Sequence, residues 1–347
     1  MIRRMAVLGA GVMGSEIAQT AAAGGVEVVL LDSDPAALER GLAHVAKICE
    51  RRVQRGRMTA EDAQAIVARI SPTVDDTGLA DCGLAIEAVP EILDVKREVF
   101  RRLDSALPAG SLLASNTSGL SISALAAETS RPDLVVGLHF FNPASVMKLV
   151  EVIRGETTSE ETMVAAEELA RALGKVPVRV RECPGFLVNR ILIRALVEAY
   201  RRAAELGADL AAADRAVVEG GPAPMGPFAL GDLIGLDTLG HIQRDLQEAY
   251  GERFGDGGEI ASRVDAGRLG KKTGAGFHDD DAPEATADAA GHEVAARYYA
   301  GALDEARRCV EEEIAAPADV DVAMRHGCGW ETGPLEWARS AEASSGG

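Results

Sequence analysis

Short apolar runs alternate with longer helical stretches along the first part of the chain. The apolar runs have the length and composition of buried strands, and they cover residues 5–8, 26–32, 83–89, 111–115 and 134–140. The stretches 15–25 and 91–107 have the composition of helices. An alternating order of strands and helices predicts a parallel, doubly wound sheet, so we expect an α/β, Rossmann-like domain here.

Residues 35–70 interrupt this alternation with two helical patterns, DPAALERGLAHVAKICERRVQRG and TAEDAQAIVARI. We interpret them as a helical insertion that reaches over a ligand bound at the sheet. The first pattern ends in a basic cluster that suits the phosphates of an extended anionic ligand: Arg51, Arg52, Arg55 and Arg57. A solvent-exposed helix face explains the same arginines at least as well.

An all-α region is expected after Pro184 and Gly185, where the alternation stops. Residues 186–206, FLVNRILIRALVEAYRRAAEL, carry apolar positions at helical spacing. Beyond residue 278 an acidic segment with proline and few large apolar residues is typical of a linker. The predicted domains are residues 1–183 for the sheet, 184–278 for a first helical domain, 279–291 for the linker and 292–338 for a second, partial helical repeat.

The second helical part repeats the first in one constant register. Matching positions include Ala195-Leu196 with Ala302-Leu303, Asp214 with Asp321, and Gly226-Pro227 with Gly333-Pro334. The matches continue without a gap, which favours a true repeat. Alanine-rich helices raise the number of matching positions by composition alone, which is the alternative explanation. Asn189 falls on Ala296 in the second copy, and we therefore interpret residues 292–338 as structural.

Composition and charge exclude several classes of protein. The chain has 347 residues, of which 47% are hydrophobic, which is ample for two or three domains with buried cores. Its formal net charge of −18 disfavours nucleic acids and anionic membranes as partners, because the mean field repels both. No apolar run approaches the roughly 20 residues that span a bilayer.

The five cysteines are scattered and include no CxxC pair, so we expect neither a disulfide framework nor a metal site. The first apolar run begins within a few residues of Met1 and leaves no room for a signal peptide. These two features predict a cytoplasmic protein.

A glycine motif joins the first apolar run to the first helical stretch. This is the order of a dinucleotide-binding unit, in which a GxGxxG motif joins a strand to a helix. The glycines allow a tight turn, a close approach of the backbone to a pyrophosphate and close packing of the helix on the strand. Asp32 ends the second run, where a carboxylate binds the adenosine ribose and repels a 2′-phosphate, so NAD is expected rather than NADP. A glycine-rich turn with a surface aspartate is the less favoured alternative. The expected cofactor-binding residues are Gly9, Gly11, Val12, Met13, Gly14 and Asp32.

Polar side chains follow the later apolar runs, at the edge where doubly wound sheets bind ligands. Asn116-Thr117-Ser118 follow one run, and the next ends near His139. If the chain turns back around Ser145, antiparallel pairing sets His139 opposite Glu151. The carboxylate then fixes the imidazole tautomer and leaves the other nitrogen to take a proton from an alcohol. A histidine in a strand is more often structural, and the neighbouring cofactor site favours the catalytic interpretation.

A series of motifs in this order resembles the 3-hydroxyacyl-CoA dehydrogenase family, which includes 3-hydroxybutyryl-CoA dehydrogenases. The motifs are GAGVMGSEIAQ, the acid-ended second strand, SNTSGLSI, HFFNPASVMKLVEVI, PGFLVNRIL, PMGPF and GKKTGAGF, from about residue 4 to residue 278. The middle motifs are far more specific than GxGxxG. The resemblance implies a dinucleotide-binding domain followed by a helical domain.

The resemblance also implies roles for individual residues. His139 is similar to the family's catalytic base and Glu151 to its partner. Ser118 and Asn189 match the groups that position the C3 oxygen and the thioester of the substrate. Nicotinamide or ribose contacts are implied for Glu91, Lys96, Ser118, Asn142 and Lys272. The family's helical insertion touches coenzyme A, which favours the arginine cluster without identifying one residue in it. Of the four arginines we choose Arg52 as the substrate-binding residue.

The implied reaction is the reversible, NAD-dependent oxidation of an (S)-3-hydroxyacyl-CoA, of short chain such as 3-hydroxybutyryl-CoA, to the 3-ketoacyl-CoA. One alternative is a dehydrogenase that acts on a hydroxyacyl-carrier protein or a free hydroxy acid. A second alternative is a non-catalytic, NAD-binding structural relative. The four groups Ser118, His139, Glu151 and Asn189 argue against a mere scaffold.

The resemblance bears on assembly as well, because the helical domain forms the dimer contact in short members of the family. A second copy that packs on the first predicts either a homodimer or a monomer whose fused repeat replaces the partner. Two residues depart from the family pattern: Gly119 replaces a common Ser or Thr, and Glu16 replaces a common small residue. Neither removes a proposed catalytic group.

Overall fold

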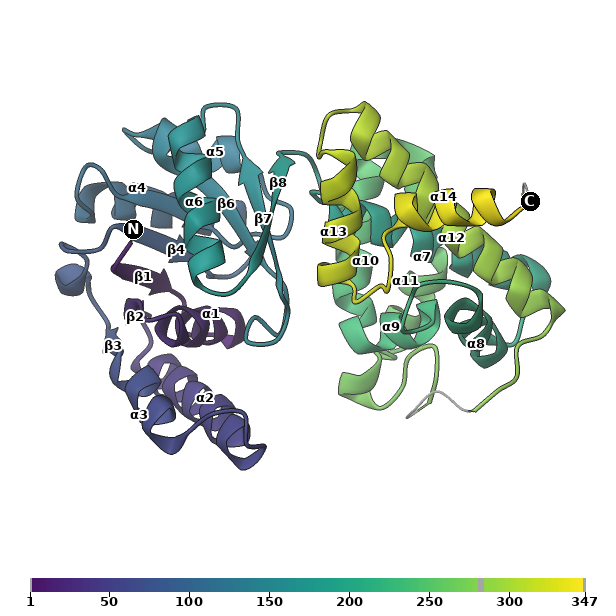
Figure 1. Ribbon diagram of the computed structural model, residues 1–347, viewed down its shortest axis with the longest axis horizontal. Coiled ribbons are helices and arrows are strands. Elements are labelled where there is room, and N and C mark those ends of the chain that lie inside the picture. Colours follow the sequence, from purple (N-terminus) through teal and green to yellow (C-terminus); the bar gives the residue numbers. More distant parts are fainter. Residues whose placement is uncertain (1, 280–283, 346–347) are drawn as a thin grey trace. The chain divides into compact units, whose positions relative to one another are not determined.

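The computed structural model describes residues 2–279 and 284–345 and divides into two compact units, Met1–Glu182 and Cys183–Gly347. The first unit contains an eight-stranded sheet in the order β3-β2-β1-β4-β5-β6-β7-β8 (Figure 1). All neighbours pair in parallel except β6 and β7, which are antiparallel. The strands are β1 Arg4–Leu8, β2 Glu27–Leu31, β3 Ile70–Thr73, β4 Leu84–Glu87, β5 Leu112–Ser115, β6 Val135–Phe140, β7 Leu149–Arg154 and β8 Val176–Arg181. The predicted doubly wound α/β fold is confirmed.

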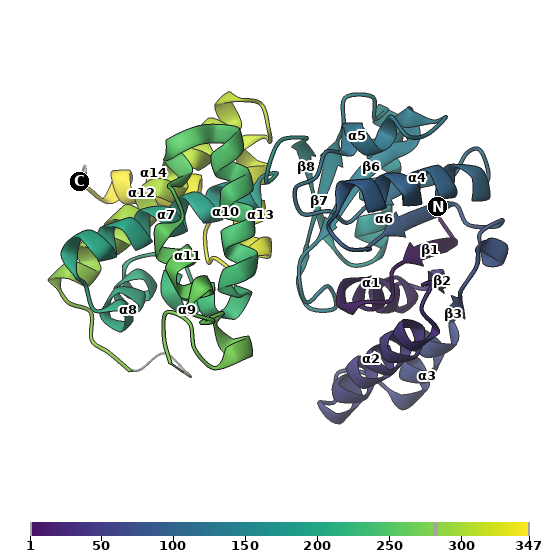
Figure 2. The ribbon, with the colours of Figure 1, turned by 180° about the vertical axis from the view of Figure 1, so that it is seen from behind.

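Helices cover both faces of this sheet: α6 lies in front of it in Figure 1, and α4 lies in front of it in the reverse view of Figure 2. The helices are α1 Val12–Ala23, α2 Pro35–Gln54, α3 Ala60–Ala68, α4 Leu93–Ala106, α5 Ile122–Ala126 and α6 Glu160–Ala172, with 3-10 turns at Asp76–Gly78 and Pro132–Leu134. Side chains of α1, α2 and α6 share one apolar cluster with the sheet. Because both faces are covered, β4 and β6 are buried along their whole length.

The predicted helical insertion consists of α2 and α3, which pack against each other and against α1. The Asp34 side chain caps α2 and accepts a hydrogen bond from the Ala36 N–H. The Thr59 side chain caps α3 and accepts a hydrogen bond from the Asp62 N–H. The edge strands β3 and β8 were not predicted. Pro72 lies inside β3, which is tolerated because β3 pairs on one side only.

The second unit is helical. Its helices are α7 Val188–Leu206, α8 Leu210–Gly220, α9 Pro227–Ile234, α10 Leu236–Tyr250, α11 Gly258–Asp265, α12 Ala289–Glu311, α13 Pro317–Gly327 and α14 Pro334–Ser345, with 3-10 turns at Gly251–Phe254 and Lys271–Thr273. Part of the predicted linker, residues 280–283, lies outside the described residues. The second repeat extends further than predicted, since α12 begins before residue 292 and α14 continues beyond residue 338.

The helix boundaries agree with the predicted register of the repeat. Both ends of α13 fall on the positions that match the ends of α8 in the predicted register, and the start of α14 matches that of α9. The capping contacts repeat as well: Asp214 accepts hydrogen bonds from the first backbone N–H groups of α9, and Asp321 does the same for α14. A side chain at Gly226 would collide with Asp214, and one at Gly333 with Asp321, which explains why both positions keep glycine.

His278 gives this unit a pH-dependent contribution to stability. Its Nε2 lies 2.8 Å from Asp214 Oδ2, and the hydrogen bond to Asp214 raises the pKa of His278. A raised pKa in the folded state means that the stabilisation is complete below the usual histidine pKa of about 6.5 and is lost as pH rises through the raised value. We expect the free energy of unfolding to decline over this window in the wild type and to vary less in His278→Gln, measured by urea unfolding. The exposed His241→Gln is the control; equal pH profiles for wild type and His278→Gln would contradict the assignment.

All five cysteines are free thiols, and among residues 2–279 and 284–345 no group of His, Cys, Asp and Glu side chains could hold a metal ion. Within the same residues no helix is long and apolar enough to cross a membrane.

Candidate active site

The glycine loop between β1 and α1 is shaped by close backbone contacts. Gly9 has a φ of +95°, and a Cβ at this position would lie 2.7 Å from the carbonyl oxygen of Ala88. A Cβ at Gly14 would lie 1.7 Å from the Gly9 carbonyl oxygen, whereas one at Gly11 would meet no atom within 4 Å. Two glycines are therefore needed for packing, and Gly11 leaves the backbone open to a ligand beside the N-terminus of α1. This geometry fits a dinucleotide pyrophosphate.

Asp32 lies at the carboxyl end of β2, beside this loop. Its Oδ2 accepts a hydrogen bond of 2.8 Å from the Ala10 N–H, and its Oδ1 accepts one of 3.0 Å from the Asp34 N–H. The carboxylate is thus fixed against the glycine loop, where the rule for such folds places the adenosine ribose. Val12 and Met13 open α1 next to Gly11, and the Val12 side chain is exposed.

The histidine and glutamate predicted to pair are opposite one another in the sheet. The register of β6 and β7 pairs His139 with Glu151, as predicted, and Nδ1 of the imidazole lies 2.7 Å from Glu151 Oε2. Glu151 is fully buried and His139 is almost so. The Phe141 ring packs against the imidazole at 4.4 Å between centroids. Because Nδ1 is committed to the carboxylate, any proton that His139 exchanges with a substrate must pass through Nε2.

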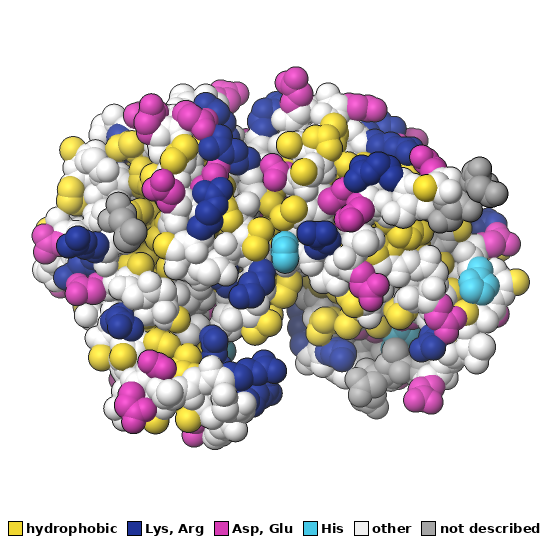
Figure 3. All heavy atoms as spheres, viewed as in Figure 1, with side chains coloured by type: hydrophobic (Ala, Val, Ile, Leu, Met, Phe, Trp, Pro, Cys, Tyr) yellow, Lys and Arg dark blue, Asp and Glu magenta, His cyan; other side chains and the backbone are white. Residues whose placement is uncertain are grey.

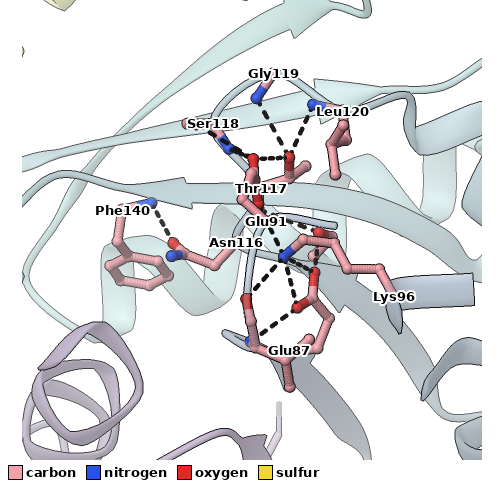
Figure 4. Close-up of polar contacts among 11 residues, drawn as sticks. Glu87, Glu91, Lys96, Asn116, Thr117, Ser118, Gly119, Leu120 and Phe140 are labelled. Atoms are coloured by element: carbon pink, nitrogen blue, oxygen red, sulfur yellow. Dashed lines mark hydrogen bonds and ion pairs between the residues drawn. The ribbon is translucent and has the colours of Figure 1, made fainter. Parts of the chain in front are cut away.

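The ends of β5 and β6 are tied together close to this pair. Asn116 Oδ1 accepts a hydrogen bond of 2.9 Å from the Phe140 N–H (Figure 4). Ser118 is two residues further along the β5 loop, and Asn142 is exposed just beyond β6. These side chains and His139 therefore belong to one edge of the sheet, at the carboxyl ends of neighbouring parallel strands.

Glu91, Thr117 and Ser118 form a hydrogen-bonded group above the end of β4. Glu91 Oε1 accepts hydrogen bonds from the Thr117 hydroxyl at 2.5 Å, the Ser118 N–H at 2.8 Å and the Ser118 hydroxyl at 3.2 Å (Figure 4). Burial opposes ionisation of Glu91, but the charge of Lys96 and these hydrogen bonds outweigh it and hold its pKa below the usual value. Glu91 is therefore a carboxylate anion at neutral pH.

Lys96 was predicted to contact the cofactor, and the structure buries it below this group. Its side chain is 1% exposed. Its ammonium lies 2.8 Å from both oxygens of Glu87, 3.0 Å from Glu91 Oε2 and 3.3 Å from the Val89 carbonyl oxygen. These partners take up all of its donors, so Lys96 supports Glu91 from below.

Glu87 was not predicted as a site residue, and it also accepts a hydrogen bond from the Ser115 hydroxyl. Burial raises the pKa of Glu87, and the charge of Lys96 opposes this rise. A signal was present in the sequence: Glu87 is the one acidic residue in the apolar run 83–89, and a buried charge requires a partner.

Glu16, which departs from the family pattern, has a structural role. It is 5% exposed, and its carboxylate lies 3.2 Å from His44 Nε2 on α2 and accepts a hydrogen bond of 3.2 Å from the Ser145 N–H. Glu16 therefore connects α1 to the helical insertion and to the loop between the strands that carry His139 and Glu151.

The remaining predicted residues lie outside the sheet. Basic side chains gather over the end of α2 in the first unit (Figure 3), where Arg52 is half-buried and Arg51, Arg55 and Arg57 are exposed. Asn189 and Lys272 belong to the second unit: Asn189 is in the first turn of α7, and Lys272 forms an ion pair with Asp237. Their participation in one site with His139 stays a prediction.

Comparison with known families agrees with this geometry. Residues 4–183 match the model of the 3-hydroxyacyl-CoA dehydrogenase NAD-binding domain, and residues 185–280 and 294–344 both match the model of the C-terminal domain of the same family. The chain belongs to the 3-hydroxyacyl-CoA dehydrogenase family. The double match to the C-terminal domain supports the internal repeat independently of the helix boundaries.

Individual members of the family are similar over most of their length. A 3-hydroxybutyryl-CoA dehydrogenase of Clostridioides difficile is 42% identical over 277 residues, which are 80% of this chain and 99% of that protein. The crystal structure of (S)-3-hydroxybutyryl-CoA dehydrogenase PaaH1 from Ralstonia eutropha matches with 39% identity and a TM-score of 0.78, over 80% of this chain and 99% of that one. The crystal structure of 3-hydroxybutyryl-CoA dehydrogenase from Escherichia coli matches with 30% identity and a TM-score of 0.90, over 98% of this chain and 92% of that one.

Proposed function

We propose that the protein oxidises short-chain (S)-3-hydroxyacyl-CoA thioesters, such as 3-hydroxybutyryl-CoA, to 3-ketoacyl-CoA with NAD, and that the reaction is reversible. The contact that carries the proposal is the 2.7 Å hydrogen bond between His139 and Glu151, at the sheet edge that also carries Ser118. A buried carboxylate on Nδ1 of a histidine is the arrangement of a general base. The names of the similar proteins agree with this reaction.

His139 removes the proton of the substrate's C3 hydroxyl through Nε2 as the C3 hydride leaves. Glu151 orients the imidazole and stabilises the imidazolium that forms. Ser118, held by Glu91, and Asn189 position the C3 oxygen and the thioester. NAD, when bound, supplies the acceptor for the hydride. In the reverse direction His139 returns its proton to the C3 oxygen.

The thioester is assigned to coenzyme A because of the basic cluster on the insertion. Arg51, Arg52, Arg55 and Arg57 gather positive charge in a chain whose net charge is −18. Guanidinium groups bind phosphates with paired hydrogen bonds, so this cluster suits the phosphates of coenzyme A. Arg52 is the proposed contact. The free thiols fit a reducing compartment, and we propose that the protein acts in the cytoplasm.

Initial rates of NADH formation across a substrate series test the proposal. The series contains (S)-3-hydroxyacyl-CoAs of increasing length, the carrier-protein thioester of 3-hydroxybutyrate and free hydroxy acids. We expect the highest kcat/KM with a short acyl-CoA. A preference for the carrier-protein thioester or a free acid would replace the assigned substrate, and the absence of NADH with every substrate would favour a non-catalytic NAD-binding protein.

The cofactor preference follows from Asp32. Its carboxylate faces the position where NADP carries a 2′-phosphate, and repulsion between two such charges costs about 1 kcal/mol or more, so kcat/KM with NADP should be lower by roughly fivefold or more. Replacement by serine, Asp32→Ser, should reduce this difference. Equal activity of the wild type with both cofactors would contradict the role of Asp32.

We propose further that the second repeat occupies the face through which short members of the family dimerise. α12 packs along α7 and α8, and the Tyr299 hydroxyl donates a hydrogen bond of 2.7 Å to the Val217 carbonyl oxygen and accepts one from the Ala223 N–H. The buried face of α12 includes Val294, Tyr298 and Ala302. Removal of this helix would therefore expose apolar surface on α7 and α8.

A chain that ends near residue 282 tests this proposal. We expect the full-length protein to be a monomer, and the truncated protein to dimerise or to lose solubility, because it exposes the face that α12 covers. Light scattering of both proteins at equal concentration measures the difference. Identical assembly and solubility would contradict the proposal.

A further inference from the structure

Three charged residues are stacked at the carboxyl end of β4, and together they form the Glu87–Lys96–Glu91 cluster (Figure 4). Glu87 is the last residue of β4 and is fully buried; Lys96 is on α4 and is 1% exposed. The ammonium lies 2.8 Å from the Glu87 carboxylate on one side and 3.0 Å from Glu91 on the other. Glu91 is the one member with substantial exposure, 36% of its side chain, so it alone presents the cluster to a ligand.

The net charge of this cluster is −1. The buried pair Glu87 and Lys96 is neutral as a whole, whether the shared proton is on the ammonium or on the carboxyl. Glu91 is ionised, because Lys96, Thr117 and Ser118 overcome the effect of its burial and lower its pKa. The charge at the surface of the cluster is therefore that of the Glu91 carboxylate.

The position of the cluster in the sheet relates it to one half of the cofactor. A dinucleotide lies across the carboxyl edge of a doubly wound sheet, at the point where the strand order reverses, which here is between β1 and β4. Asp32 at the end of β2 takes the adenosine half. The nicotinamide half of a bound dinucleotide would therefore extend towards the ends of β4 and β5, where Glu91 and Ser118 are joined by hydrogen bonds.

We propose that the Glu91 carboxylate strengthens the binding of oxidised NAD relative to that of reduced NAD, and that Glu87 and Lys96 are positioning residues that act only through Glu91. The nicotinamide ring is a cation when oxidised and neutral when reduced, so a nearby anion stabilises the oxidised form alone. The inference rests on the proposed function, since it requires a nicotinamide at this edge. The family resemblance instead assigns Lys96 a direct contact with the cofactor, whereas the inference gives it an indirect role through Glu91.

Dissociation constants of NAD⁺ and NADH, measured by calorimetry without substrate, test the inference. Glu91→Gln removes the surface charge, and we expect it to weaken NAD⁺ relative to NADH by about tenfold, equal to about 1.4 kcal/mol. Glu87→Gln leaves the Lys96 ammonium to cancel Glu91, so the same shift is expected from a residue that cannot touch a cofactor. The double variant Glu87→Gln/Lys96→Met restores the net charge of −1, and the wild-type ratio should return.

A matched control is the buried ion pair of Asp104 and Arg131 in the same unit, with side chains 16% and 9% exposed. Asp104 is near the end of α4 and Arg131 precedes β6, so the pair lies at the amino edge of the sheet. Asp104→Asn should leave the ratio of the two dissociation constants unchanged.

The outcomes separate the inference from the proposed function. If the wild type binds neither NAD⁺ nor NADH, the proposed function fails. If it binds both and Glu91→Gln changes the two affinities by the same factor, only the inference is overturned. An unchanged ratio in Glu87→Gln, or a double variant that loses affinity for both forms, would show that the buried pair does not act through Glu91. Because Glu91 is exposed, its variant is expected to fold even if Glu87→Gln does not.

Discussion

His139→Gln is expected to lower kcat by about 10²–10⁴-fold, the usual contribution of a general base, while the affinity for NAD stays close to that of the wild type. The loss follows from the geometry of the pair. His139 Nδ1 lies 2.7 Å from Glu151 Oε2, so the imidazole is fixed in one orientation and Nε2 is the nitrogen that we expect to meet the substrate. Glutamine keeps a polar side chain of similar size but cannot carry the proton. Steady-state kinetics measures kcat, and calorimetry measures the affinity for NAD. An unchanged kcat would contradict the assignment of His139 as the general base.

Glu151→Gln separates orientation from charge. A glutamine oxygen can still accept a hydrogen bond from Nδ1, but a neutral acceptor stabilises an imidazolium less than a carboxylate does. The difference between charged and neutral hydrogen bonds is about 1 kcal/mol, so we expect a loss of roughly fivefold to tenfold in kcat, smaller than for His139→Gln. A loss as large as that of His139→Gln would mean that Glu151 does more than stabilise charge.

Arg190→Met is expected to lower the free energy of unfolding of the second unit by about 3–5 kcal/mol, the usual cost when one partner of a buried ion pair is removed. Arg190 on α7 and Glu305 on α12 are both fully buried. Nε and Nη2 of the guanidinium lie 2.9 and 2.6 Å from Glu305 Oε1, and Nη1 lies 2.9 Å from Glu312. The substitution takes the main partner from the buried Glu305 carboxylate and leaves it beside Arg253, at 3.5 Å.

The same pair connects the first helical repeat to the second, so its loss should loosen α12 from α7. Both tryptophans, Trp330 and Trp337, are in the second repeat, and urea unfolding followed by their fluorescence therefore reports on this unit. Arg215→Met removes an exposed ion pair with Glu219 on α8 and should cost no more than about 0.5 kcal/mol. The double variant Arg190→Met/Glu305→Leu should recover most of the lost stability. Equal midpoints for Arg190→Met and Arg215→Met would contradict the argument.

The sequence was sufficient for the elements with strong local signals. Apolar runs bounded by helices predicted the central strands, and the equal spacing of His139 and Glu151 from Ser145 predicted their register, which the structure has. The repeat was predicted because its residues, including Asp214 and Asp321, recur at one offset. The edge strands were missed for different reasons: β3 contains Pro72, and the alternation in β8 lies close to the predicted domain boundary.

Burial of charged residues was the part of the site that the sequence could not predict. Nothing in the pattern around Lys96 distinguishes a lysine that reaches a ligand from one that is enclosed by Glu87 and Glu91, because both positions are consistent with an amphipathic helix. Likewise Glu16 was identified as a departure, but its contacts with His44 and Ser145 depend on how α2 and a distant loop pack against α1. These contacts join residues up to 129 positions apart, beyond the reach of local patterns.

In the proposed reaction His139 takes the proton of the C3 hydroxyl of a 3-hydroxyacyl-CoA as the C3 hydride is transferred to NAD. The most direct measurement is the initial rate of NADH formation from (S)-3-hydroxybutyryl-CoA by the wild type and by His139→Gln, after calorimetry has shown that both bind NAD equally. We expect rapid turnover by the wild type and a loss of about 10²–10⁴-fold in the variant. Equal rates in the two proteins, or no NADH from the wild type, would contradict it.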